Sequence, residues 1–169
     1  MKEIERKWKI KFCAETFAGK THYERLDVIQ FYIGRIRIRK IYYIRTGEEK
    51  YTLTIKGDGT LSREEFEVEI PEEIFERMHD DHRISSSRYF GRIIKKYIYT
   101  YPIEDNLLLE IHTFIGEHMG LSILECEFPD EETANDFELP EWIREHVIEE
   151  VTEDERYQNK NLAVNGLPD

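Results

Sequence analysis

The chain has 169 residues, of which 40% are hydrophobic, 12% aromatic and 36% charged. This length supports one substantial hydrophobic core, and this aromatic content excludes a disordered chain. Because 24 Lys and Arg residues stand against 36 Asp and Glu residues, the formal net charge is −12. Such a charge opposes binding to nucleic acid or to anionic membranes, so an anionic ligand would need a locally basic pocket. We therefore expect one domain over residues 1–169 with no nucleic-acid and no membrane partner.

Cysteine usage and hydropathy bear on where the protein works. Cys13 and Cys126 lie far apart in the sequence and show neither a disulfide framework nor zinc spacing, as is usual in a reducing cytoplasm. No apolar run has the length of a membrane span, and the first residues lack the apolar segment of a signal peptide. We expect a cytoplasmic protein that is a monomer or a homodimer.

Most of the chain has the alternating pattern of β-strands, whose successive side chains point to opposite faces. The expected strands cover residues 3–10, 28–33, 35–45, 51–56, 63–70, 84–90, 93–101, 107–115 and 122–128. The GDGT segment at 57–60 predicts a hairpin turn. Proline and acidic residues at the start of a segment predict short helices. These cover residues 71–81, 129–137 and 140–151.

One face of these strands is unusually charged. In the opening strand Glu3, Glu5, Lys7 and Lys9 alternate with a mostly apolar set. The same alternation recurs in RIRIRK (35–40), YTLTIK (51–56), REEFEVEI (63–70), LLLEIH (107–112) and LECEF (124–128). An open antiparallel sheet with one solvated face would explain any single strand. Whole strands sorted into arginine faces and glutamate faces instead favour a closed barrel around a polyanion and a divalent metal.

The order of these motifs resembles a known family, the CYTH-domain proteins or triphosphate tunnel metalloenzymes. EIERK at 3–7 is similar to the family's ExExK motif. The paired arginines of RIRIRK, the TIK strand with its hairpin, RxExE at 63–67, SSR at 86–88, ECEF at 125–128 and EDERYQNKNLA at 153–163 follow in the family's order. The resemblance implies an α+β, mainly β fold: an eight-stranded antiparallel closed barrel with a few covering helices.

The resemblance also implies roles for individual residues. Glu3, Glu5 and Glu127 would bind Mg²⁺ or Mn²⁺, with Glu110 as a further ligand, and Glu3, Glu5 and Lys7 would be catalytic. The expected phosphate-binding residues are Lys7, Arg37, Arg39, Lys56, Arg63 and Arg88, with Lys160 closing the tunnel. Glu65, Glu67, Glu110 and Glu125 would form the acidic wall. One ion would bridge phosphate oxygens, and a second ion or a wall glutamate would orient the attacking water.

Two positions depart from the family pattern. Ser86 stands where a phosphate-binding lysine is usual, a loss that Lys95 or Lys96 could replace. His112 stands where an acid is frequent, and imidazole binds Mn²⁺ better than Mg²⁺. Both departures concern efficiency and substrate choice rather than the fold.

The expected activity is hydrolysis of a small triphosphate, foremost inorganic tripolyphosphate, to pyrophosphate and phosphate. The alternatives are a class IV adenylate cyclase, a thiamine triphosphatase and a non-catalytic module that binds polyphosphate or nucleotides. An RNA triphosphatase is disfavoured by the net charge of −12.

Three further groups have structural interpretations. His79 and His82 are read as a solvated helix end rather than a metal site. Cys126 is read as a buried, inert thiol, and the alternating Tyr97, Tyr99 and Tyr101 as an ordinary hairpin arm.

Overall fold

The computed structural model describes residues 2–11, 24–84 and 91–169. Within these ranges the strands are β1 (Lys2–Ile10), β2 (Glu24–Ile33), β3 (Ile36–Tyr43), β4 (Glu49–Lys56), β5 (Ser62–Glu69), β6 (Ile94–Pro102), β7 (Leu108–Ile115), β8 (Ser122–Glu127) and β9 (Val147–Glu150). The α-helices are α1 (Glu72–Ile84), α2 (Glu131–Asp136), α3 (Glu141–Arg144) and α4 (Asn159–Asn165). Single 3₁₀ turns cover Glu104–Asn106, Gly116–His118 and Glu155–Tyr157.

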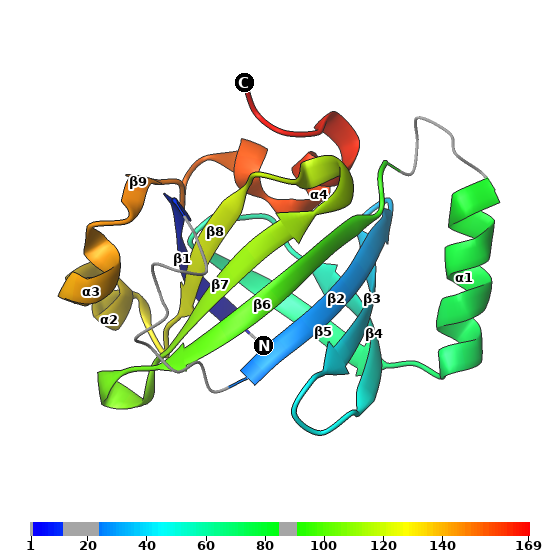
Figure 1. Cartoon of the computed structure of the whole chain (residues 1–169), viewed down its shortest axis with the longest axis horizontal. Helices are drawn as coiled ribbons and strands as arrows, with labels where there is room; N and C mark the ends of the chain where they lie inside the picture. Colours follow the sequence, from blue (N-terminus) through cyan, green and yellow to red (C-terminus); the bar gives the residue numbers. More distant parts are fainter. Residues whose placement is uncertain (1, 12–23, 85–90) are drawn as a thin grey trace.

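The strands form a closed antiparallel barrel (Figure 1). In the described ranges eight strands follow one another in the order β5-β4-β3-β2-β6-β7-β8-β1, and β1 closes the ring by pairing with β5. Closure uses the first residues of β1, where Lys2, Glu3 and Ile4 pair with Glu64, Arg63 and Ser62. This confirms the predicted closed barrel.

The predicted hairpin at residues 57–60 joins β4 to β5. Its backbone requires glycine at position 59, where φ is +128° and a Cβ atom would lie 2.3 Å from the carbonyl oxygen of Ser62. The hairpin sets the register that places Thr54 opposite Glu67 and Lys56 opposite Glu65. Both pairs therefore point into the barrel.

Helix α1 packs on the outside of the barrel, along β3 and β4 (Figure 1). Its Phe75 lies in a cluster with Phe31, Ile38 and Tyr51, and the ring centroids of Phe31 and Phe75 are 5.8 Å apart. Helices α2 and α3 cover the apolar side of β1 and β8, where Trp8 and Leu124 are buried. On β4 and β5 some outward apolar side chains, such as Phe66, are exposed, so helices cover only part of the expected apolar exterior.

The C-terminal segment covers one end of the barrel. Tyr157, Leu162 and Ala163 pack against Ile94 and other apolar residues of the strands. On the inward face of β6, Ile94 packs beneath the C-terminal segment. The polar cavity starts further along the strand, at Lys96.

Three sequence expectations differ from the structure. The helix expected over residues 140–151 ends at Arg144, and Val147–Glu150 forms β9, which pairs with the end of β1. The strand expected over 84–90 begins with Ile84, which ends α1; residues 85–90 lie outside the described ranges. His82 is buried rather than solvated, with its ring centroid 4.8 Å from that of Phe31. It is part of the packing beneath α1.

No helix in residues 2–11, 24–84 and 91–169 has both the length and the apolar character needed to cross a membrane.

The packing of α1 gives a stability prediction. Phe75 is 2% exposed, whereas its neighbour Ile74 is 48% exposed. We expect Phe75→Ala to lower the free energy of unfolding by about 3–5 kcal/mol, because it leaves a cavity between α1 and the barrel. The control Ile74→Ala should change it by less than about 0.5 kcal/mol. Urea denaturation measures both, and equal effects would contradict the packing described.

Candidate active site

The barrel encloses a cavity of about 790 Å³. Strand alternation turns one face of each strand into the cavity, and most of the expected charged residues on that face line it, although Lys9 does not. The cavity is lined by Glu3, Glu5, Lys7, Arg37, Arg39, Lys56, Arg63, Glu65, Glu67, Glu110, Glu125, Glu127 and Lys160. Arg88 and Ser86 lie outside the described residues.

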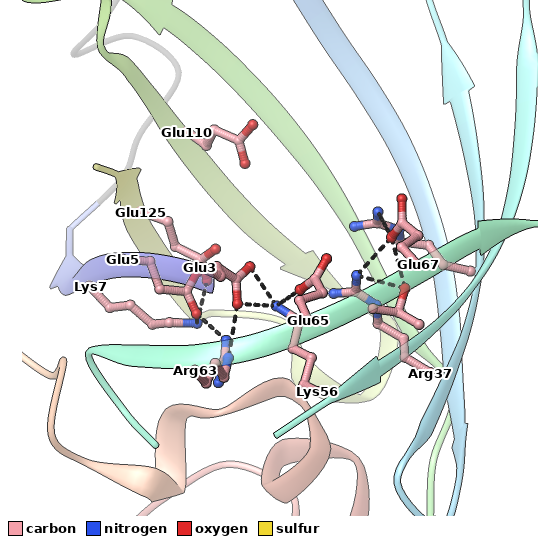
Figure 2. Close-up of polar contacts among 12 residues, drawn as sticks. Glu3, Glu5, Lys7, Arg37, Lys56, Arg63, Glu65, Glu67, Glu110 and Glu125 are labelled. Atoms are coloured by element: carbon pink, nitrogen blue, oxygen red, sulfur yellow. Dashed lines mark hydrogen bonds and ion pairs between the residues drawn. The ribbon is translucent and has the colours of Figure 1, made fainter. Parts of the chain in front are cut away.

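A continuous chain of ion pairs links β1, β4 and β5 (Figure 2). The Lys56 ammonium contacts both carboxylate oxygens of Glu3, at 2.7 and 2.8 Å, and Arg63 Nε donates to Glu3 at 2.9 Å. Arg63 also pairs with Glu5, which lies 3.1 Å from Lys7 Nζ. Burial acts to raise the pKa of Glu5, but Lys7, Lys56 and Arg63 lower it overall. Glu5 is thus ionised, and lysine and arginine side chains hold both Glu3 and Glu5.

A second network joins β3 to β5 through Glu67 (Figure 2). One Glu67 oxygen accepts from Arg37 at 3.3 Å, from Arg39 at 3.1 Å and from the Thr54 hydroxyl at 2.8 Å. One carboxylate therefore compensates two guanidinium groups. Burial, and then the charge of Arg37, lower the pKa of Arg39 to about 10. The Nε atoms of both arginines are buried and have no hydrogen-bond partner within the described part of the chain. These are unused donors at a cavity wall.

Lys7 connects the β1 network to the far wall. Its Nζ lies 3.1 Å from both Glu5 and Glu125, and Lys7 stands opposite Glu125 in the pairing of β1 with β8. Burial acts to lower the pKa of Lys7, but the charges of Glu125 and Glu5 raise it overall. Lys7 is therefore a buried, permanently charged ammonium at neutral pH.

Two of the predicted carboxylates have no lysine or arginine ion pair among the described residues. Glu127 lies opposite Glu5 across β1 and β8, and burial together with Glu3, Glu5 and Glu65 raises its pKa. Glu110 contacts a histidine instead of a cationic lysine or arginine. In Figure 2 Glu110 stands apart from the ion-pair chain of Glu3 and Glu5. The oxygens of these two carboxylates are therefore free of lysine and arginine partners within the described ranges.

Lys96 is a cavity residue that the sequence suggested only as a replacement for a missing lysine. It is 3% exposed and lines the cavity, whereas Lys95 points out to solvent. Its Nζ lies 2.8 Å from Nδ1 of His112 and 3.3 Å from Oδ1 of Asn159. The alternation in IIKKYIYT was the available signal, because it places Lys96 on the face of Ile94 and Ile98. The contribution of Asn159 from α4 had no sequence signal.

The environment of Lys96 makes stability depend on pH. Burial, reinforced by Lys7 and the arginines of β3, lowers the pKa of Lys96 to about 7, against about 10.4 in an unfolded chain. Between these values the unfolded chain binds more protons at this site, so the free energy of unfolding rises with pH from about 7 to about 10. We expect the free energy of unfolding of the wild-type protein, minus that of Lys96→Met, to rise with pH across that range. Urea denaturation of both proteins at several pH values measures this difference. A pH-independent difference would contradict it, and Lys95→Met serves as the exposed control.

Comparison with known proteins points to one activity. A scan against models of protein families finds no match. The chain is 33% identical over 168 residues to an inorganic triphosphatase of Nitrosomonas europaea, covering 97% of this chain and 98% of that protein. It is 37% identical over 123 residues to an inorganic triphosphatase of Acetivibrio thermocellus, covering 72% and 70% of the two chains.

Solved structures agree in architecture. The crystal structure of the inorganic triphosphatase NE1496 superposes with a TM-score of 0.61 and 29% identity, and the match covers 98% of this chain and 97% of that one. A protein from Pyrococcus horikoshii, PH1819, shares the fold with a TM-score of 0.54 at 20% identity. The sequence similarity extends over nearly the whole length of both chains, and the charged barrel and the order of its motifs agree with it. The chain therefore belongs to the inorganic triphosphatases of the triphosphate tunnel metalloenzyme family.

Proposed function

We propose that this protein is a divalent-metal-dependent triphosphatase that hydrolyses inorganic tripolyphosphate to pyrophosphate and phosphate. The observation that carries the proposal is the pair of guanidinium groups of Arg37 and Arg39 on the cavity wall, which share one carboxylate, Glu67, and whose Nε donors have no partner within the described ranges. Burying a donor without a partner costs free energy, and phosphate oxygens are the acceptors that a guanidinium group matches best. A linear polyanion in the cavity would balance the guanidinium charge that the single carboxylate of Glu67 leaves uncompensated.

The basic side of the cavity would bind and orient the phosphates. Arg37 and Arg39 extend from β3, while Lys7, Lys56 and Arg63 are held by carboxylates on neighbouring strands. Each cation is therefore fixed before the substrate arrives, and stabilising charge on a phosphoryl group then requires little reorganisation. We propose the same role for Lys96, with Arg88 and Lys160 as further contacts.

The acidic residues fit a hard divalent cation. Glu3, Glu5 and Glu127 offer only oxygen ligands. Burial and the neighbouring carboxylates raise the pKa of Glu127, and a cation would relieve the repulsion among these carboxylates. We propose that these three residues hold Mg²⁺ or Mn²⁺. When bound, the ion would neutralise phosphate charge. Glu110, His112 and Glu125 offer a second set of ligand atoms, which all lie within 4.8 Å of one another.

A wall carboxylate would orient the attacking water. Glu110 is suited to this because, among the described residues, it has no lysine or arginine ion pair that would occupy its oxygens. It stands opposite Glu125 across β7 and β8 and lines the cavity. A carboxylate there can accept a hydrogen bond from water beside the bound phosphates. The remaining wall residues, Glu65 and Glu67, would hold the basic side chains in place.

A class IV adenylate cyclase is the second candidate function. The cavity also has an apolar part, where Leu107, Leu108 and Phe128 contribute to its lining. An apolar surface beside a phosphate site could contact a nucleobase. The full-length similarity to an inorganic triphosphatase favours hydrolysis of tripolyphosphate.

The test is phosphate release from tripolyphosphate, ATP and thiamine triphosphate, each with Mg²⁺ and then Mn²⁺. We expect turnover of tripolyphosphate well above that of both organic substrates. Cyclic AMP formed from ATP would identify a cyclase instead. Tripolyphosphate binding measured by calorimetry, without release from any substrate, would identify a binding module and refute the hydrolase.

We also propose that the 169 residues form one domain that acts in the cytoplasm, as a monomer or a homodimer. Size-exclusion chromatography with light scattering would establish the oligomeric state.

A further inference from the structure

The pairing of β2 distinguishes the two ends of the barrel cavity. Glu24 at the start of β2 pairs with Thr100 near the end of β6, and Ile33 at the end of β2 pairs with Ile36 at the start of β3. The turn between β6 and β7 therefore lies at one end of the barrel, the β6–β7 end. The turn between β2 and β3 lies at the other, the β2–β3 end (Figure 1). The C-terminal segment with α4 also lies at the β2–β3 end.

The charged side chains that line the cavity differ between these ends. Among the described residues, the β6–β7 turn and the start of β7 contribute two acidic and no basic side chains to the lining: Asp105, Asn106, Leu107, Leu108 and Glu110. At the β2–β3 end, the turns and the C-terminal segment contribute two basic and two acidic side chains: Arg35, Lys160, Asp58 and Glu155. A polyanion therefore meets an acidic rim at the first end and a rim of balanced charge at the second.

Arg35 extends the arginines of β3 out to solvent. Arg35, Arg37 and Arg39 alternate in the sequence, and all three line the cavity. Alternate residues of an extended chain share one side and lie about 6.6 Å apart. The side chain of Arg35 is 62% exposed, against 20% for Arg39 and 9% for Arg37. The row therefore leads from the β2–β3 end to the arginine pair that shares Glu67.

The ion pair of Arg35 is one that an incoming anion can replace. Nη2 of Arg35 donates to Asp58 in the β4–β5 hairpin, and the Asp58 side chain is 89% exposed. An exposed ion pair contributes little to stability. A phosphate group, in contrast, can accept two parallel hydrogen bonds from one guanidinium group. Arg35 can therefore exchange Asp58 for a phosphate, while its charge stays at the entrance.

We propose that tripolyphosphate enters the barrel at the β2–β3 end and that Arg35 is the residue that receives it, releasing Asp58 and passing the phosphates on to Arg37 and Arg39. The proposal rests on the proposed function, because it concerns how the substrate reaches the same site. The net charge of −12 opposes the approach of a polyanion, so association depends on local basic groups at the point of entry. Arg35 and Lys160 are such groups at this end.

The first test removes one positive charge at each end of the barrel. We expect Arg35→Gln to lower kcat/KM for tripolyphosphate about fivefold in about 0.01 M salt and less in about 0.15 M salt, with kcat changed less than about twofold. The matched control is Arg45→Gln. Arg45 is exposed at the β6–β7 end, where its backbone N–H donates to Glu24, and its loss should lower kcat/KM less than about twofold. Equal losses in both variants would show a general effect of net charge and refute the proposal.

The second test removes one acidic group at each end. Asp58→Asn leaves Arg35 without its carboxylate and should raise kcat/KM about two- to threefold. In the Arg35→Gln background the same substitution should have less than half of this effect. Asp105→Asn changes the acidic turn at the β6–β7 end, where φ is +59° and asparagine is well tolerated. A rise in kcat/KM in Asp105→Asn, without one in Asp58→Asn, would place the entrance at the β6–β7 end and overturn the proposal.

The wild-type protein separates this proposal from the proposed function. Turnover of tripolyphosphate by the wild type, with equal effects of Arg35→Gln and Arg45→Gln, would refute the entrance alone. If the wild type binds tripolyphosphate without turnover, the hydrolase fails, and Kd values from calorimetry replace kcat/KM in the same comparisons. If the wild type neither binds nor hydrolyses tripolyphosphate, both proposals fail.

Discussion

Replacing Glu127 by glutamine should lower tripolyphosphate turnover about 10²- to 10³-fold. Glu127 lies among Glu3, Glu5 and Glu65, and it has no lysine or arginine ion pair within the described ranges. The substitution keeps the shape of the side chain but removes one anionic ligand from the proposed metal site. We expect the Mg²⁺ concentration for half-maximal activity to rise about tenfold or more as well. A metal titration of initial rates, followed by phosphate release, measures both quantities.

This substitution separates metal binding from folding. Since Glu127 forms no ion pair with a lysine or arginine among residues 2–11, 24–84 and 91–169, Glu127→Gln should leave the unfolding midpoint within a few degrees of wild type or raise it. The control is Glu132→Gln, which changes an exposed glutamate on α2 and should leave activity unchanged. Wild-type metal dependence in Glu127→Gln would show that the ion is bound elsewhere.

Replacing Arg63 by methionine should affect stability most strongly in the absence of metal. Arg63 is the cation between Glu3 and Glu5, and its loss leaves Glu3 with Lys56 alone and Glu5 with Lys7 alone. Removing one partner of a buried ion pair costs about 3–5 kcal/mol. We expect a decrease of that size in the free energy of unfolding at pH 7, together with loss of tripolyphosphate turnover. Urea denaturation without divalent ions measures the first, and phosphate release the second.

A divalent cation should partly replace the missing guanidinium charge. If Glu3 and Glu5 hold the ion, Mg²⁺ at millimolar concentration should stabilise Arg63→Met more than it stabilises the wild-type protein. Arg83→Met is the control, because that arginine is 70% exposed on α1, and it should behave as wild type. Equal stabilisation of both proteins by Mg²⁺ would show that the ion does not bind beside these carboxylates.

The alternation of charge in the sequence predicted most of the barrel interior, for a simple physical reason. In a strand the side-chain period is two, so Arg37 and Arg39, or Glu3, Glu5 and Lys7, must share a face once the strand forms. The family resemblance then supplied the number of strands and the closure of the barrel. The residues that β-pairing brings together across strands were therefore largely predictable.

The features that the sequence did not predict depend on contacts between distant segments. EWIREHVIEE has apolar residues at helical spacing, yet Val147–Glu150 forms a strand that pairs with the end of β1. That end of β1 is available because β5 pairs only with the start of β1. Tertiary pairing overrides local propensity in such a short segment. The contact of Lys96 with Asn159 likewise requires the C-terminal helix to lie against the barrel. No local sequence pattern predicts the contact of Lys96 with Asn159 or the position of His82 against Phe31.

The three-way pairing of β1 has a consequence for the order in which the protein can assemble. Glu3 pairs with Arg63 in β5, Lys7 pairs with Glu125 in β8, and Trp8 pairs with Glu150 in β9. During synthesis the chain emerges from its N-terminus at about 5–20 residues per second, so Lys7 is made several seconds before its partner carboxylate on β8. Until then only the start of β1 can pair, with β5, and Lys7 lacks the carboxylate of Glu125. The later strands β8 and β9 therefore complete the part of the barrel that β1 begins.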